Sequence, residues 1–456
     1  MRTFAYQSEY ADGNLALALA PALTRKGIEE RPNFFTGFAV YPQVFARGLL
    51  VLAEITNTRY FKYIPTALRD PVLTAQGDRL RAECFSACGG VYARLDLMQA
   101  GFDGNIDFGT TNVDIGQDLR QALNSIKQKD KMRVTIGSGG LQIRGFAASH
   151  FSNAGGNVIN MSEPIHQRPV KMPPRWIRAL GNAAEIHRGM KQVFSIKGAP
   201  AQMFVSALPS ATGKNQAGWL TYTPKGIKLM PLASADAVFV SGLHRLSALK
   251  RVMTNVSAIA FYAPENSAPG HFMVGLELSG MRITISLTAD ASQGYSGEGA
   301  LLESLAGEEI LEDAGAVNAM LDFDAAVNES KISSRWGMDT NRLHRALAYL
   351  AVSGKLGFDT QERAYFHREL PQDPGRVLKD NPRLAAARKL VELVEKVSDN
   401  GGDKYIVRSK DTEYVVSYNP AWDLQKARCS CEWYSSHLNR RGPCKHILAV
   451  KLRSEG

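Results

Sequence analysis

Three cysteines and one histidine near the end of the chain have the residue types and the spacing of a zinc site. Cys429 and Cys431 form a Cys-x-Cys pair, and Cys444 and His446 follow after twelve residues as a Cys-x-His pair. In structural sites, Zn²⁺ binds four thiolate or imidazole ligands in a tetrahedron. The spacing therefore predicts one structural zinc ion that is held by these four side chains and has no open position for water.

The neighbouring residues predict the elements that position these ligands. Side chains alternate between the two faces of a strand, so an extended segment would place Cys429 and Cys431 on one side. Pro443 is typical of a helix start, and the apolar residues after it predict a helix that begins at the second pair. Two alternating runs within 404–418 predict a hairpin that leads into the cysteines. We expect a small ββα zinc module over residues 403–454.

Together with Trp433 and Gly442-Pro443, the four ligands resemble the SWIM zinc finger over about residues 404–453. The resemblance implies a structural zinc ion and binding to DNA or to protein. Segments 109–114, 294–299 and 357–371 are also similar to bacterial SWIM-finger proteins that are encoded beside MoxR-type AAA ATPases and von Willebrand A-domain proteins. This second resemblance implies those two proteins as partners, and it implies no reaction.

Basic residues surround the four ligands, and two interpretations of them remain open. They are Lys426, Arg428, Arg440, Arg441 and Lys445. Positive charge would favour thiolate and metal by lowering the pKa of the cysteines, but it would also suit phosphate. Residues 331–456 hold 23 Lys and Arg against 15 Asp and Glu, so most of the net charge of +10 lies there. An acidic partner would meet this part of the chain. His437 lies outside the pair spacing, and we expect it at the surface.

With 456 residues, the chain is long enough for several domains. In residues 1–310, a strand, a short helix and antiparallel strands recur around predicted helices at 118–126, 174–180 and 243–253. This order predicts an α+β region with two or three repeated units. It is similar in outline to DNA sliding clamps, which would imply a ring, and a generic α+β domain is the alternative.

Residues 311–372 have the order of a winged helix-turn-helix. A helix is expected at 317–327, a second helix starts at the cap Asp339 and ends at Gly354, and two strands follow at 356–358 and 364–368. The basic residues that could reach phosphates are Arg342, Arg345, Lys355, Arg363 and Arg368. Asp359 and Glu362 in the wing would repel DNA. A helix from Asn381 to about Val397 and a linker at 398–403 complete the predicted multi-domain α+β chain, with residues 375–400 between the winged-helix unit and the finger.

The rest of the sequence gives no catalytic constellation. Residues 294–298 resemble a nucleophile elbow but carry Glu298 where that motif needs glycine. Cys84 and Cys88 lie apart from the metal pairs, so we expect them to be buried apolar residues. No apolar run approaches the ~20 residues that cross a bilayer, and the first residues do not resemble a signal peptide, so we expect a cytoplasmic protein with no membrane partner.

These observations favour a non-enzymatic zinc adaptor that binds proteins within an ATPase-driven assembly. DNA binding by the basic C-terminal quarter is the alternative. An enzyme within residues 1–310 is the third hypothesis.

Overall fold

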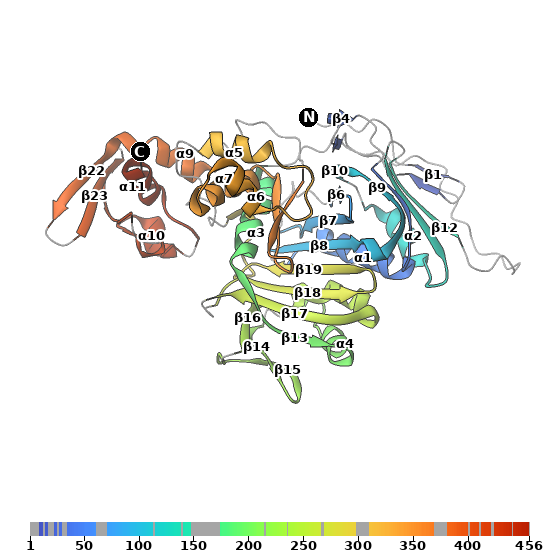
Figure 1. Ribbon diagram of the computed structural model, residues 1–456. Helices are drawn as coiled ribbons and strands as arrows, with labels where there is room; N and C mark the ends of the chain where they lie inside the picture. Colours follow the sequence, from blue (N-terminus) through green and yellow to red (C-terminus); the bar gives the residue numbers. More distant parts are fainter. Residues whose placement is uncertain are drawn as a thin grey trace, which may run out of the picture.

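The computed structural model describes residues 9–11, 14–16, 22–24, 27–29, 34–60, 71–112, 115–137, 140–146, 174–213, 216–234, 236–265, 269–297, 310–368, 381–399, 402–409, 412–420, 424–439 and 441–455. Helices and strands are mixed in these ranges, as the α+β prediction requires. None of the described helices has the length and apolar character needed to span a membrane. In Figure 1, the C-terminal elements lie at one side of the molecule beside α5 and α7, and β1 and β12 lie at the other.

A ten-stranded antiparallel sheet forms the centre of the body. Its order is β13 (Met190–Lys197), β17 (Val256–Pro264), β18 (Phe272–Leu278), β19 (Met281–Leu287), β8 (Val91–Met98), β7 (Arg79–Phe85), β6 (Val72–Gln76), β10 (Phe108–Asn112), β3 (Ala22–Thr24) and β4 (Gly27–Glu29). The sequence predicts strands at 272–278 and 281–287, and β18 and β19 confirm both with these bounds. The sheet thus connects segments that are far apart in the chain.

Two smaller sheets flank the central one. The first has the order β1 (Glu9–Ala11), β2 (Asn14–Ala16), β12 (Gly140–Phe146), β11 (Lys131–Gly137), β5 (Phe35–Ala39) and β9 (Phe102–Ile106), and the second has the order β15 (Gly226–Met230), β14 (Ala217–Thr223) and β16 (Ala237–Ser241). The helices of this region are α1 (Pro42–Asn57), α2 (Gln117–Ser125), α3 (Pro174–Arg188), α4 (Ala199–Ser206) and the 3₁₀ helix η2 (Leu243–Asn255), with the short 3₁₀ turns η1 (Gln99–Gly101) and η3 (Tyr295–Gly297). The helices expected at 118–126, 174–180 and 243–253 are therefore confirmed, the last as a 3₁₀ helix. The sequence also predicts a strand at 169–172 and a helix at about 300–306, and both lie outside the described residues.

The central sheet has one apolar face and one polar face, and both are buried. Along β7, β8 and β19 the aliphatic side chains point to the face covered by α1, whereas the alternate positions carry polar or aromatic side chains. The polar set on these strands is Arg79, Arg81, Glu83, Tyr92, Arg94, Asp96, Arg282, Thr284 and Ser286. Alternation of this kind normally marks a sheet with one solvated face. Here the polar face is covered instead by later parts of the chain.

The hairpin of β20 (Leu356–Asp359) and β21 (Ala364–His367) lies on this polar face through the ion pairs of Asp359, and α3 packs on Phe85 and Tyr92. The helices α5 (Ile310–Asn318), α6 (Glu329–Trp336) and α7 (Thr340–Val352) also follow the sheet in sequence, and α7 contacts α3 and β20. The side chain of Asp339 accepts a hydrogen bond from the N–H of Arg342 at 2.8 Å, which confirms the predicted cap of α7. The helix expected at 317–327 is wrong, because the Asp324 carboxylate accepts from the N–H of Asp322 and Phe323 has a φ of 56°. A positive φ at Phe323 interrupts a right-handed helix. The winged-helix assignment stays a prediction.

The C-terminal elements are α9 (Pro382–Arg388), η4 (Val391–Leu393), β22 (Val394–Asp399), β23 (Gly402–Ser409), β24 (Thr412–Ser417), η5 (Leu424–Lys426), β25 (Arg428–Cys429), α10 (Glu432–His437) and α11 (Lys445–Glu455). The hairpin of β23 and β24 and the helix after Pro443 confirm the predicted order. The helix expected to reach Val397 and the linker at 398–403 are wrong. Residues 394–399 instead pair with β23, since contacts across a sheet outweigh local helix propensity.

The finger does not have a core of its own. Ile310 of α5 and Ala348 and Val352 of α7 belong to the same buried cluster as Leu448 and Val450 of α11. The four-stranded sheet and α11 therefore fold against the middle helices.

Candidate metal centre

The structure brings the four predicted ligands together. One ligand atom from each of Cys429, Cys431, Cys444 and His446 lies within 4.8 Å of the others, and all four residues are buried. The Sγ of Cys429 is 3.6 Å from Nδ1 of His446. Zn–S bonds of about 2.3 Å and Zn–N bonds of about 2.1 Å in a tetrahedron need ligand atoms at about this separation. Three sulfurs and one imidazole nitrogen therefore fit a structural Zn²⁺.

The two halves of the site come from a strand end and two helix starts. Cys429 ends β25, where it pairs with Val416 of β24. Cys431 caps α10, and its Sγ accepts from the N–H of Tyr434 at 3.4 Å. The extended backbone expected for both cysteines of the first pair is confirmed, because Cys429 lies in β25 and Cys431, although it caps α10, has a φ of −81° and a ψ of 156°. At the start of α11, the Sγ of Cys444 accepts from the N–H of Ile447 at 3.5 Å. Helix N-termini favour negative charge, so both positions favour thiolate.

Without a bound metal ion, the three thiols donate hydrogen bonds to one another, so the ionisation of one thiol opposes the ionisation of the next. Hydrogen bonds from Cys429 and Cys444 lower the pKa of Cys431, and the bond that Cys429 donates to Cys431 raises the pKa of Cys429. A divalent cation binds all three as thiolates and so removes this competition. The donor set thus suits a metal better than it suits protons.

The imidazole of His446 is held by packing. Its ring stacks on Tyr414 with a centroid distance of 4.0 Å and an interplanar angle of 18°. His437, which we expected at the surface, ends α10 with its ring 4.3 Å from that of Trp433 and is half-buried. It does not belong to the cluster of ligand atoms found in the described residues.

The comparison with protein families matches the SWIM zinc finger model to residues 414–455. This part of the chain is a SWIM zinc finger. The match contains all four ligands but begins inside the sheet, so β22 and β23 lie before it. The finger accounts for a small share of the chain, and the family of the remainder is not defined by it.

The other comparisons give little on the body. No curated protein matches the chain. A proliferating cellular nuclear antigen from Entamoeba histolytica is similar at 11% identity and a TM-score of 0.33, covering 56% of this chain and 98% of that chain. The PCNA2-PCNA3 complex from Sulfolobus tokodaii gives 8% identity, the same coverage and a TM-score of 0.33. Likenesses at this TM-score carry no argument, so the clamp-like ring stays a prediction.

Arg383 and Arg441 lie beside the segment that leads into the second ligand pair, Cys444 and His446. The guanidinium of Arg383, on α9, lies 4.5 Å from the ring centroid of Trp433, and that of Arg441 lies 6.0 Å from it. Nη1 of Arg383 also donates to the carbonyls of Arg441 at 2.8 Å and Pro443 at 3.2 Å. Among the basic residues expected around the metal, Lys426 and Arg428 are exposed, Lys445 is half-buried, and Arg440 lies outside the described residues.

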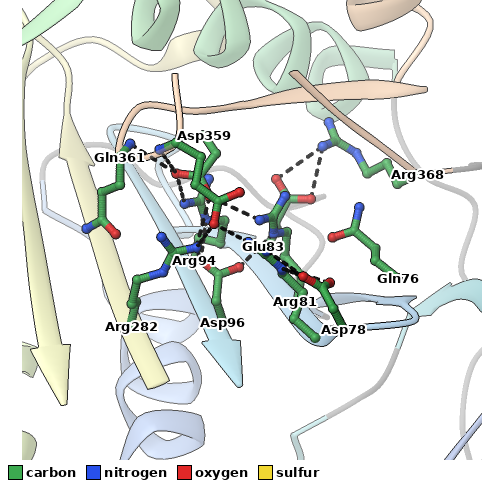
Figure 2. Close-up of polar contacts among 12 residues, drawn as sticks. Gln76, Asp78, Arg81, Glu83, Arg94, Asp96, Arg282, Asp359, Gln361 and Arg368 are labelled. Carbon is green, nitrogen blue, oxygen red and sulfur yellow. Dashed lines mark hydrogen bonds and ion pairs between the residues drawn. The ribbon is translucent and has the colours of Figure 1, made fainter. Parts of the chain in front are cut away.

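A second polar cluster, which sequence reasoning missed, joins the β20–β21 hairpin to the central sheet (Figure 2). Asp359 of the hairpin forms ion pairs with Arg94 at 2.9 Å, with Arg81 at 3.1 Å and with Arg282 at 3.2 Å. Asp96 of β8 binds Arg81 at 2.6 Å and Arg94 at 3.0 Å. The side chains of Arg81, Asp96 and Asp359 are completely buried. We call these five residues the docking network.

The same geometry removes two of the five basic residues of the middle region from the DNA-contact hypothesis, which stays a prediction for Arg345, Lys355 and Arg363. Arg368 is fully buried and pairs with Glu83 at 3.0 Å, and Arg342 forms two bonds of 2.7 Å with Asp313. Neither of these arginines is directed to a phosphate. Asp359, expected to repel DNA from the wing, faces arginines inside the protein. The hairpin thus uses its charges for docking within the chain.

Acid is expected to weaken this docking. Burial by itself would raise the pKa of Asp359, but the guanidinium groups of Arg94 and Arg81 outweigh burial and hold that pKa well below its ordinary value of 3.8. Burial likewise opposes Arg81 and Arg94 at Asp96, whose pKa is also lowered. A carboxyl with a lowered folded pKa contributes stability above its unfolded pKa and loses it as pH falls towards the folded pKa.

We therefore expect the hairpin to lose protection below about pH 4, with Asp359 and Asp96 protonating as it opens. Hydrogen exchange at residues 356–367, measured between pH 6 and pH 2 and corrected for the intrinsic exchange rate, checks this. Protection that stays constant across this range would contradict it.

Proposed function

We propose that the chain is a non-enzymatic, zinc-containing adaptor whose SWIM finger binds a protein partner. The observation that supports this most is an apolar patch on the outer face of the finger's four-stranded sheet. Val415 of β24 is 49% exposed, and Ile406 of β23 lies directly opposite it in the strand pairing. Val397 of β22 is on the same face, since it pairs with Lys404, two residues before Ile406. Both Ile406 and Val397 are partly exposed.

Charges at the rim of this patch are paired with one another. Arg408 binds Glu395 at 3.0 Å and Glu413 at 3.0 Å, and all three side chains are exposed. Two carboxylates beside one guanidinium make a poor site for phosphate, because they repel it. An apolar centre with a paired polar rim is instead the usual composition of a protein interface. The opposite face, with Val407 and Val416, is buried in the cluster that the finger shares with α5 and α7.

The partner proposed for this patch belongs to an ATPase-driven assembly. The resemblance to SWIM-finger proteins encoded beside MoxR-type AAA ATPases and von Willebrand A-domain proteins supplies this idea, and the patch supplies a surface for it. Zinc has a structural role in the proposal, because it would join β25, the edge strand of this sheet, to the start of α11.

Val415→Asp tests the patch. It places a charge in the centre of the apolar face, and we expect the affinity for the partner to fall at least about tenfold. The full-length protein, the ATPase and the A-domain protein would be purified, and binding would be measured by titration calorimetry. Lys426→Ala, at an exposed position of η5, is the matched control, and both variants should retain one zinc ion. Absence of binding by the wild-type protein to both candidates would reject this partner assignment.

DNA binding by the finger is a second candidate, favoured by the exposed basic residues Arg388, Lys389, Lys426, Arg428 and Arg453. Binding to phosphates releases counterions, so affinity for duplex DNA would fall steeply between about 50 and 200 mM salt. Under the protein-binding proposal, the full-length chain should show no retention of a labelled duplex even at the low end. Strong retention with a steep salt dependence would replace the adaptor by a DNA-binding role.

A further inference from the structure

One contact between the finger and the body starts next to a zinc ligand. Arg441 lies three residues before Cys444, and its Nη2 donates to the carbonyl of Gly297 at 2.8 Å. Gly297 belongs to η3, which follows β19 in the body, and it lies 144 residues before Arg441 in the sequence. The contact therefore connects the metal-binding turn to a distant segment of the chain.

The loop on the other side of this contact is anchored in the core of the body. Tyr295 is fully buried, and its N–H donates to the carbonyl of Gly89 at 2.9 Å. Asn182 of α3 donates to the carbonyl of Tyr295 at 2.9 Å, and the Tyr295 hydroxyl lies 2.5 Å from Oγ of Ser286 on β19. A change at Gly297 is thus next to a residue that joins α3 to the central sheet.

Arg441 fits closely at this point. A Cβ added to Gly297 would overlap Nη2 of Arg441, so a side chain at residue 297 would displace the guanidinium from its present place on the loop. On its other side, the Arg441 backbone is held by Arg383 of α9, whose Nη1 binds the carbonyls of Arg441 and Pro443. The turn 441–443 is therefore fixed at one end by the ligand Cys444 and at its flank by Arg383.

We infer that Arg441 is a positioning residue that couples the metal-bound turn of the finger to the 294–297 loop of the body. With Cys444 bound to the metal, the turn holds the guanidinium on the carbonyl of Gly297. When the metal is removed, Cys444 no longer fixes the turn, and the Gly297 carbonyl loses its donor. The loop then opens more often, so the opening of this loop in the body depends on whether the finger has bound its metal ion. This device does not depend on which partner the finger binds.

The test is hydrogen exchange on the full-length protein, with and without a chelator. In the wild-type protein, removal of zinc should speed exchange of the amides of Tyr295 and Gly297 by about tenfold or more, in addition to the exchange of the finger itself. Arg441→Gln should show the fast loop exchange already with zinc bound, and chelation should add little. Metal content, measured by elemental analysis, should remain one zinc ion per chain in this variant.

Gly297→Ala changes the same contact on the side of the body. Gly297 does not have a positive φ, so alanine is tolerated by the backbone and acts through the overlap with Arg441. It should reproduce the fast exchange at Tyr295 without loss of zinc, and combining it with Arg441→Gln should give no further increase. Arg453→Gln, at an exposed arginine in the last turn of α11, is the matched control and should behave as the wild type. The inference would be overturned if the exchange rate of the loop amides did not change on chelation in the wild-type protein. It would also be overturned if that rate were the same as in the wild type in both contact variants.

Discussion

Cys444→Ala is expected to unfold the C-terminal unit, residues 381–455, while the sheets of the body remain folded. The substitution removes one of four ligands at the start of α11, and structural zinc stabilises small modules by about 10–16 kcal/mol. The apolar core that remains is shared with α5 and α7 and is too small to replace the metal. Limited proteolysis with mass spectrometry should show cleavage within the C-terminal unit and an intact body, and elemental analysis should show that the zinc is lost.

Cys84→Ala is the control for this experiment. Cys84 is a buried cysteine of β7, so its loss should create a small cavity and cost about 1 kcal/mol without loss of zinc. A Cys444→Ala protein whose C-terminal unit stayed resistant to protease would show that the metal does not hold this unit together.

Asp359→Asn is expected to destabilise the docking of the β20–β21 hairpin by about 3–5 kcal/mol. The amide keeps the shape of the side chain but leaves Arg81, Arg94 and Arg282 with one buried negative partner fewer. Charges buried without compensation are costly, although the intact network is itself only weakly stabilising compared with an apolar contact. Chemical denaturation followed by circular dichroism, together with hydrogen exchange at residues 356–367, measures the loss.

Two further variants make this prediction specific. Asp103→Asn removes an exposed carboxylate from β9 and should change stability by less than about 0.5 kcal/mol. Combining Asp359→Asn with Arg94→Met should cost less than the sum of the two single changes, because each removes charge that the other leaves unpaired. Additive costs would show that the pair does not interact.

The zinc site could be predicted because its chemistry is local in the sequence. Two ligand pairs lie within a short segment, and Pro443 and the apolar residues after it place the second pair at a helix start. The geometry needed no knowledge of the rest of the fold, apart from the cap at Cys431. The outer apolar patch was not visible, because residues 394–399 look helical until their pairing with β23 is known.

The docking network could not be predicted for a different reason. Asp359 and Arg81 are 278 residues apart, and neither has a spacing that indicates the other. The alternation of charged and aliphatic residues in β7 and β8 correctly predicts strands, but it also predicts that the charges face water. Only the placement of the hairpin on that face turns exposed charges into buried ion pairs. The nearly equal numbers of arginines and acidic residues along these strands indicate ion pairs, but they do not indicate that the hairpin is the partner.

The continuous core of the finger, α5 and α7 has a consequence for gene architecture. A segment cut at residue 414 would carry every metal ligand, yet it would leave β24 without β23 and would remove Ala348 and Val352 from the buried cluster to which Leu448 and Val450 belong. Unpaired strand edges and bare apolar surface promote aggregation. Recombination could therefore transplant this finger into another protein only together with its helical support, so the motif and its neighbours should be inherited as one block.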